Sequence, residues 1–431
     1  MKKLLFSIAS ILLAAGLFAQ EVNFSGDLNT AWGLTAPWTS EAWDFDLGKI
    51  DFTGGIEAYM DKSTAFVEAS IGYDFVQFNL DWSINEAYID YSDSLWGLRI
   101  GRQKWAWGKA DGVNITNCVF PEDSTSLFND DSSLGVDALR LSLYGNSFTV
   151  DAMWIPFFRG TSLPLDDSNP LKKYVIPSSY TISIPAYNIN QTVAISIGSI
   201  TNPELKIENG EYALKASGYF SAFDISLYGF YGFEKTPTLS YTKNNPNVYS
   251  IPESITVNGT YKRMTMIGLD TAFPIGELVI RAEGAYFPER EMQSSATSIL
   301  AGGETSIKQH QIMGLAGIDW MPNGWTITAQ YYCDYIFNKS DNLDREKAYQ
   351  HGSTLSISKT FLNETLELSL SGLIGWNYFD SAISFEAAYS LSDQIGLSAG
   401  LFAFIPGPEK NGTYGKYKDL STIYIKAEYK F

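Results

Sequence analysis

The sequence predicts an all-β fold, a transmembrane antiparallel up-and-down β-barrel of about 18 strands. Three observations lead to this prediction. Segment after segment alternates apolar and polar residues, and the connections between them are alternately short and long. Beyond residue 19, no apolar stretch approaches the length of about 18 residues that a spanning helix needs. A strand between lipid and water alternates in this way, and the sheet must close because lipid tolerates no open edge.

The start of the chain is typical of a secretory signal peptide. Two lysines precede an apolar run from Leu4 to Ala15, and the small residue Ala19 marks the expected cleavage site. The run is too short for a spanning helix. We therefore expect a signal peptide over residues 1–19 and one barrel domain over residues 20–431, in a bacterial outer membrane.

Composition supports this class of protein and excludes others. Aromatic residues make up 15% of the chain and charged residues only 18%, and the 26 Tyr and 11 Trp suit two membrane interfaces. The formal net charge of −18 argues against nucleic acid or anionic lipid surfaces as partners. The partners that we expect are membrane lipids, including the outer leaflet, and small polar solutes or ions.

The alternating segments begin at Val22 and continue to the end of the chain. Placing both termini on the periplasmic side requires an even number of strands, about 18, with 16 and 20 as alternatives. A count of 20 would need strands within 174–184 and 192–200. The clearest segments lie at residues 22–32, 50–58, 65–73, 78–84, 96–100, 139–143, 148–154, 212–220, 225–233, 278–286, 312–320, 325–337, 366–370, 383–389, 395–403 and 421–431.

Connections of two kinds alternate along the chain. Turn-favouring residues form the short ones, and the longer ones are polar, which is the pattern of periplasmic turns and external loops. Short turns are expected at 61–62, 92–93, 145–146, 221–222, 274–276, 322–324, 363 and 392–393. Long loops are expected at 34–47, 106–134, 158–210, 236–259, 289–306, 338–350 and 406–420.

The last segment, Ser421–Phe431, has the pattern of a closing strand. Its alternate residues from Ile423 to Phe431 are apolar, and the aromatic Phe431 ends the chain. We expect the barrel-assembly machinery to recognise this strand. Because strands begin at Val22, no room is left for an N-terminal plug, which argues against TonB-dependent transporters and fatty-acid channels with a hatch.

The alternation assigns each side chain to lipid or to the lumen. Leu28, Phe52, Leu141, Leu227, Leu368 and Ile425 should face lipid, whereas Asp81, Arg99, Arg140 and Glu283 should face water. Twelve acids and seven bases fall on the lumen side, which favours a hydrated pore with a modest preference for cations. The alternative is that these positions are merely wet and that their charges pair across strands.

The most unusual segment is Leu98–Thr125, in which basic residues, two Trp and several acids follow a strand. Its Gly-Arg-Gln, Trp-Gly-Lys, Ala-Asp-Gly and Pro-Glu-Asp motifs, with Trp-Ile-Pro-Phe at 154–157, resemble those of a porin-like outer-membrane family. The resemblance implies a porin-like barrel and names no substrate.

If this segment folds inward, it forms a pore constriction, where a local basic cluster could favour anions. Its candidate residues are Arg99, Arg102, Lys109, Asp111, Asp81 and Arg140. The alternative is an ordinary external loop whose Trp pair sits at the membrane interface.

Other reactive residues are few. Cys118 and Cys333 are too few for a disulfide framework, and neither His310 nor His351 has a second metal ligand at a suitable spacing. We expect no cofactor, no metal and no enzymatic activity. The function expected is a porin or channel for passive diffusion. The alternatives are a structural or adhesin-type barrel that displays its loops and, last, a hydrolase that uses His351 and Ser353.

Overall fold

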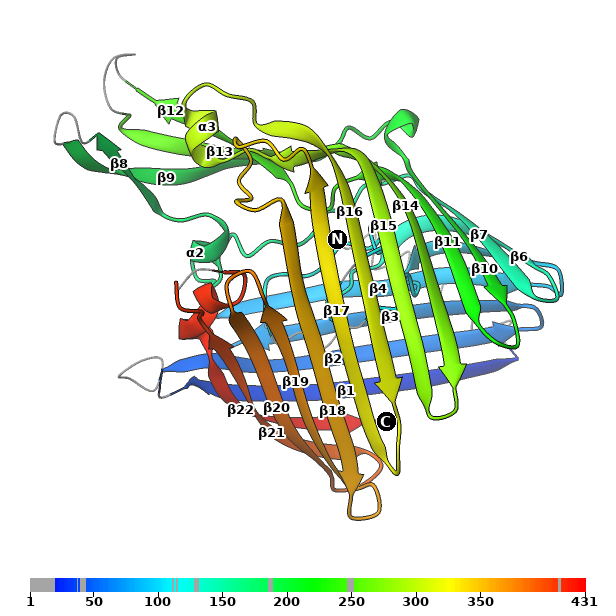
Figure 1. The fold of residues 1–431 in the computed structure, drawn as a ribbon. Coiled ribbons are helices and arrows are strands. Elements are labelled where there is room, and N and C mark those ends of the chain that lie inside the picture. Colours follow the sequence, from blue (N-terminus) through cyan, green and yellow to red (C-terminus); the bar gives the residue numbers. More distant parts are fainter. Residues whose placement is uncertain are drawn as a thin grey trace.

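The computed structural model describes residues 20–36, 38, 44–110, 112–113, 115–127, 132–184, 189–245, 252–409 and 412–431, so the predicted signal peptide lies outside the described residues. Within these ranges, eighteen strands form one closed antiparallel barrel, which confirms the predicted fold class and strand count (Figure 1). Within the same ranges, no helix combines the length and the apolar character that crossing a membrane requires.

The barrel strands follow the chain, with two insertions. The first seven are β1 (Glu21–Thr35), β2 (Phe45–Met60), β3 (Ser63–Asp74), β4 (Asn79–Ser92), β5 (Trp96–Gln103), β6 (Val136–Tyr144) and β7 (Phe148–Ile155). The others are β10 (Glu211–Tyr219), β11 (Asp224–Phe233), β14 (Arg263–Ile275), β15 (Leu278–Gln293), β16 (Ser306–Trp320), β17 (Trp325–Phe337), β18 (Tyr349–Phe361), β19 (Leu366–Gly375), β20 (Asp380–Ser390), β21 (Ile395–Ile405) and β22 (Thr422–Lys430).

The barrel closes between its first and last strands. β1 pairs with β22 from Asp27 opposite Lys430 to Thr35 opposite Thr422. Beyond this ladder, Gly26 and Phe431 exchange two backbone N–H to C=O hydrogen bonds of 3.0 Å. A Cβ at Gly26 would lie 2.2 Å from the Phe431 ring, so this close approach needs glycine. The last strand is therefore the closing strand that the sequence predicts.

The two faces of the barrel wall follow the predicted alternation. Leu28, Phe52, Leu141, Leu227 and Ile425 are all exposed on the outside, with Ile425 at 60%, and Leu368 is half-buried. In contrast, Glu283 is only 5% exposed and points inward. A sheet with this many exposed apolar side chains is suited to an apolar surrounding rather than to water.

Short and long connections lie at opposite ends of the barrel, as predicted. The long connections span 36–44, 104–135, 156–210, 234–262, 294–305, 338–348 and 406–421. Two tight turns, 75–78 and 376–379, lie at the same end of the barrel as these long connections. The short turns lie at the other end, together with the beginning of β1 and the end of β22.

Two of the long loops together carry a second sheet. Loop 156–210 contains β8 (Ser179–Ile184) and β9 (Ile189–Thr201), and loop 234–262 contains β12 (Thr238–Asn244) and β13 (Ser254–Thr260). β9 pairs parallel with β13, and the resulting four-stranded sheet projects away from the barrel (Figure 1). The strands on which a count of 20 depended therefore exist outside the barrel, because β7 pairs directly with β10.

The described helices are short and lie in loops. They are α2 (Lys172–Val175), η2 (Ile207–Asn209), α3 (Ala296–Leu300) and η3 (Gly415–Leu420). The Tyr174 ring of α2 lies 4.8 Å from the Tyr417 ring of η3. The first part of loop 156–210 therefore extends from β7 to the loop between β21 and β22, across the mouth of the barrel.

Candidate functional site

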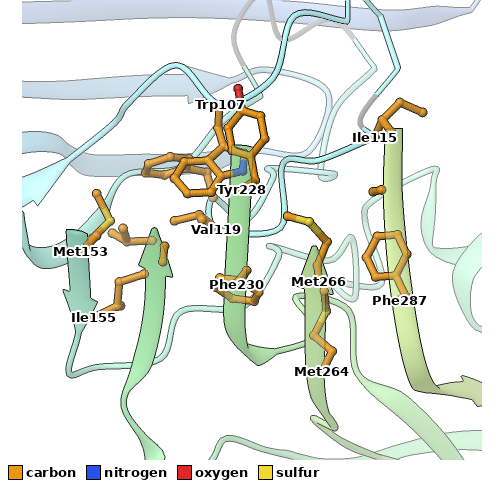
Figure 2. Close-up of a cluster of buried hydrophobic side chains, with 14 of the residues drawn as sticks. Trp107, Ile115, Val119, Met153, Ile155, Tyr228, Phe230, Met264, Met266 and Phe287 are labelled. Carbon is orange, nitrogen blue, oxygen red and sulfur yellow. The ribbon is translucent and has the colours of Figure 1, made fainter. Parts of the chain in front are cut away.

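Residues 104–127, here called the inward loop, leave β5 and fold into the barrel. Trp107, Ile115, Val119 and Phe120 are buried. They belong to one apolar cluster with residues of the barrel wall (Figure 2). The wall residues are Val136, Ala138, Met153, Ile155, Ala213, Tyr228, Phe230, Met264, Met266, Ala285, Phe287 and Leu315. The segment is therefore not the ordinary external loop that the sequence left as an alternative.

Aromatic packing fixes the first turn of the inward loop. The Trp107 ring lies 5.0 Å from the Tyr228 ring and 5.2 Å from the Trp105 ring, the latter in an edge-on arrangement. Burying a large apolar side chain contributes about 1.5–3 kcal/mol. Several such side chains make the loop a packed part of the barrel interior.

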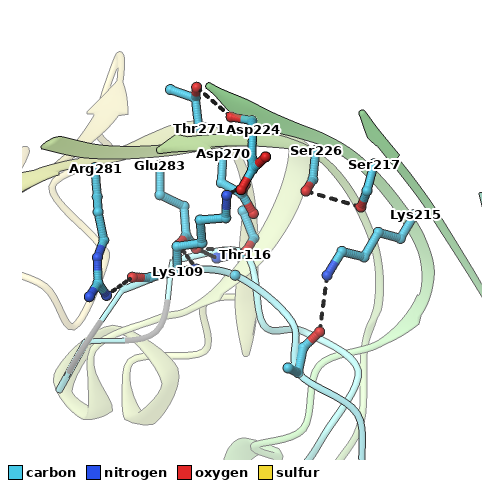
Figure 3. Close-up of polar contacts among 12 residues, drawn as sticks. Lys109, Thr116, Lys215, Ser217, Asp224, Ser226, Asp270, Thr271, Arg281 and Glu283 are labelled. Atoms are coloured by element: carbon cyan, nitrogen blue, oxygen red, sulfur yellow. Dashed lines mark hydrogen bonds and ion pairs between the residues drawn. The ribbon is translucent and has the colours of Figure 1, made fainter. Parts of the chain in front are cut away.

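A single carboxylate on β15 holds the inward loop by four hydrogen bonds (Figure 3). Glu283 Oε2 accepts from the backbone N–H groups of Lys109 at 2.7 Å and Ala110 at 2.9 Å. Its Oε1 accepts from Thr116 N at 2.8 Å and Thr116 Oγ1 at 2.6 Å. Hydrogen bonds to a charged group are worth about 1.5–3 kcal/mol each. Glu283 therefore ties both ends of the segment 109–116 to the wall.

Glycine at position 108 permits this contact. Gly108 has φ +87°, and a Cβ there would lie 2.8 Å from Glu283 Oε1 and 2.9 Å from Thr116 Oγ1. Both the backbone conformation and the space require glycine. The Trp-Gly-Lys motif thus has a structural reason, namely the approach of the loop backbone to the Glu283 carboxylate.

Further polar contacts join the inward loop to neighbouring strands. Arg281 Nη1 donates to Lys109 O at 3.1 Å, and Lys215 Nζ donates to Ala106 O at 3.1 Å (Figure 3). Lys109 Nζ lies 3.4 Å from Oδ1 of Asp270, which is completely buried. A buried carboxylate needs such a partner because desolvation otherwise disfavours its charge.

The inward loop also crosses the lumen. A Cβ at Gly112 would lie 4.0 Å from Leu373 Cδ2 on β19, across the barrel from β5, the strand that the loop leaves. Farther along the loop, Asn169 Nδ2 of loop 156–210 donates to Thr125 O at 2.8 Å. The loop therefore divides the interior, and the segment before α2 packs onto it.

The wall that the apolar cluster leaves free is polar. Thr53 and Ser70 share a hydrogen bond of 2.9 Å, and Asn85 Nδ2 donates to Ser70 Oγ at 2.6 Å and to Glu68 Oε1 at 3.1 Å. Towards the end of the barrel that carries the long loops, here called the external end, lies a cavity of ≈ 300 Å³. This wall, the inward loop and loop 156–210 bound it. Its charged lining residues are Lys49, Asp51, Asp74, Asp81, Asp123 and Asp166.

Two of the six predicted constriction residues are neighbours on the inner wall. Arg99 and Arg140 face each other on β5 and β6. Arg99 Nε lies 2.9 Å from Asp90 Oδ1. The Arg140 guanidinium lies 4.9 Å from the Trp105 ring, and Lys215 Nζ lies 5.2 Å from the same ring. Trp105 is therefore a contact for two cations.

The other four candidates do not join this pair in one ring. Arg102 lies on the outside of the wall, where it opposes Asp137 and forms two hydrogen bonds with it, at 2.9 and 3.0 Å. Lys109 is in the inward loop and turns to Asp270. Asp81 lies in the acidic cavity, about 30 Å along β4 from Asp90. Asp111 lies outside the described residues.

Arg102 thus departs from the expectation, and its neighbours explain why. The outward side chains of β6 include Leu139 and Leu141, at 37% and 38% exposed, whereas inward Val136 and Ala138 are 0% and 5% exposed. Asp137 has the outward parity, and Arg102 is its cross-strand partner. The pairing of Arg102 with Asp137 places it on this face, although Gly101 before it has φ +129°.

Thiols, imidazoles and hydroxyls occur at scattered positions. Both cysteines are free, and burial raises the pKa of the Cys118 thiol in the inward loop to about 12. Nδ1 of His351 pairs with the Tyr331 hydroxyl at 2.9 Å, while Ser353 Oγ accepts from Trp376 Nε1 at 2.9 Å. Over the described part of the chain, no group of three His, Cys, Asp or Glu residues is placed to hold a metal ion.

The barrel fold is shared with solved structures that include an outer membrane protein. OccAB3 of Acinetobacter baumannii has a TM-score of 0.51 at 10% identity, covering 95% of this chain and 99% of that chain. The outer membrane protein opdK of Pseudomonas aeruginosa has a TM-score of 0.52 at 9% identity, covering 96% and 99%. OccK2 (OpdF) of the same species, in complex with glucuronate, has a TM-score of 0.52 at 11% identity, covering 96% of both chains. The predicted resemblance to porin-like barrels is confirmed for the fold.

Sequence comparison places the chain in one family. Residues 77–419 match the family described as "Protein of unknown function (DUF1302)", and the chain belongs to it. Among curated proteins, none matches the sequence.

Proposed function

We propose that the protein is an outer-membrane channel for passive diffusion of small polar solutes or ions. The observation that carries this proposal is a closed barrel whose interior is apolar and filled on one side, where the inward loop packs, and polar on the other. A wet, polar half beside a packed half is what a narrowed aqueous path requires. A barrel of 18 strands is also too wide for its own wall side chains to fill.

Further observations support the proposed location. The outward face is apolar, the first 19 residues are typical of an export signal, and opdK, which has the same fold, is an outer membrane protein. The ligand of OccK2, glucuronate, is a small polar solute. A channel role rather than an enzymatic one also fits the pair His351 and Ser353. His351 forms a hydrogen bond with the Tyr331 hydroxyl, and Ser353 accepts one from Trp376 Nε1.

We also infer a modest preference for cations. The external cavity has five aspartates and one lysine, so its net charge is negative. Elsewhere in the lumen, acids such as Asp319 and Asp334 form ion pairs with arginines, which neutralise their charge. Exposed charges act over about 8 Å at physiological salt, so the charges nearest the path dominate. Arg99 and Arg140 oppose the preference on the inner wall.

Conductance of the purified protein in a planar bilayer, with a salt gradient to read ion preference, tests the proposal. We expect steady open channels and a reversal potential whose sign shows cation preference. The preference should decline as salt is added, because salt screens the charges. Silence of a protein that shows heat-modifiable gel migration would reject the channel. Anion selectivity that disappears in Arg99→Ala would reject the cation preference and assign the path to the basic pair.

One observation favours a second candidate, a barrel that displays its loops. The sheet of β8, β9, β12 and β13 stands away from the barrel at the long-loop end (Figure 1). A folded but silent barrel whose external sheet mediates adhesion would support this candidate.

A further inference from the structure

The Glu283 carboxylate is buried in an environment built by the inward loop. At 5% exposed, it accepts three backbone N–H groups and one hydroxyl, all from residues 109–116. The donors come from both ends of this segment, so one side chain closes it into a small loop around the carboxylate. No solute can reach these donors while Glu283 occupies them.

Other contacts hold the flanks of the segment and part of the segment itself. Trp107 lies before it, and Val119 and Phe120 lie after it, all packed in the apolar cluster. Between the Glu283 anchors, Gly112 is exposed and approaches β19 on the far side of the lumen. Within the described part of the segment, Ile115 also belongs to the cluster, and Ala110 and Val113 pack against it. Glu283 therefore supplies the polar anchor of the loop backbone, beside this apolar packing.

We propose that Glu283 is the positioning residue that sets the width of the path, as a latch that holds segment 109–116 across the lumen. This inference rests on the proposed channel function. Loss of the carboxylate charge leaves three backbone donors without a charged acceptor and loosens the segment, whereas the apolar contacts stay packed. The path then widens and fluctuates. Gly108 belongs to the same device because only glycine admits the carboxylate.

Cys118 gives a readout that does not depend on conductance. It lies two residues after Thr116, is half-buried, and is chemically distinguishable once Cys333 is replaced. In a Cys333→Ser background, we expect Glu283→Gln to raise the alkylation rate of Cys118 about tenfold or more, the effect of losing one charge-assisted hydrogen bond. Thr116→Val removes only the hydroxyl donor and should raise the rate less.

The matched control is Glu386→Gln, which removes a luminal charge on β20 that bonds to Tyr424 and not to the inward loop. In bilayers, Glu283→Gln should show a higher and noisier conductance than Glu386→Gln, with both variants folded by gel migration. Labelling and conductance of Glu283→Gln equal to those of the control would overturn the latch even if the wild type conducts. A silent wild type would reject the channel, and faster Cys118 labelling would then still support the latch.

Discussion

The two sides of the barrel interior differ in the side chains that face inward. From β6 to β16 the inward positions near the external end are large and apolar, including Met266 at 0% and Phe287 at 1% exposed. From β2 to β4 they are polar or charged, such as Ser70 and Asp81. From β18 to β20 they are smaller and mixed, with Ser371 beside Ala382. The same strand architecture therefore serves as a docking surface on one side and as a wet wall on the other.

This difference predicts unequal effects of truncation. Phe287→Ala should lower the free energy of unfolding by about 3–5 kcal/mol, because it leaves a cavity beneath the inward loop. Ser371→Ala on the polar side should change it by less than about 0.5 kcal/mol. Denaturant unfolding in detergent measures both, and equal losses would show that the packed side is not tightly packed.

Thiol reactivity provides the second test. Because the pKa of Cys118 is raised to about 12, the reactive thiolate is about a thousandfold scarcer than for an ordinary thiol at pH 8. In the folded Cys333→Ser protein, alkylation should stay slow until the pH nears that pKa, and in the unfolded protein it should be fast. Mass spectrometry of the modified peptide reads the rate. Fast labelling of the folded wild-type loop would place Cys118 on the wet side.

A third test compares the outside of the wall with the wet side of the lumen. Leu141→Arg should cost about 2–4 kcal/mol near the membrane midplane, because an outward charge meets lipid. Asp81→Arg, in the aqueous cavity, should be tolerated. Unfolding in lipid vesicles gives both values, and the predicted register fails if the two costs are the same.

The smallest effects concern ion preference. Arg99→Ala should increase the preference for cations by less than about 1 kcal/mol, the Coulomb energy of two unit charges 4 Å apart in water. Arg102→Ala should leave the reversal potential unchanged, since Arg102 lies outside the wall with Asp137. A shift in Arg102→Ala equal to that in Arg99→Ala would contradict this placement.

The sequence predicts the barrel well because its signal is local. Alternation within each strand assigns Leu227 of β11 to the outer face and Glu283 of β15 to the inner face without knowledge of any neighbouring strand. The turn residues mark where strands end. The closing strand could be recognised from Ile423, Ile425 and Phe431 for the same reason. Even the extra strands β8 and β9 fall where the pattern places them.

The site could be predicted only in part because its contacts are not local. Glu283 was assigned to the lumen, but its partners lie more than 160 residues away in the chain. One signal was present: near the long-loop end, the inward positions of β6, β7 and β14 become apolar, as at Ala138, Met153 and Met266. An inward face that loses its polarity indicates that something other than water covers it.

The external sheet has a consequence for the order of assembly. Its central contact, β9 with β13, joins parallel strands from two different loops, so it cannot form as a local hairpin. Both loops must reach the same side before the strands can meet, and the long separation along the chain makes this pairing slow. We therefore expect the small sheet to form late in folding, after the barrel strands that flank its two loops, β7, β10, β11 and β14, have paired.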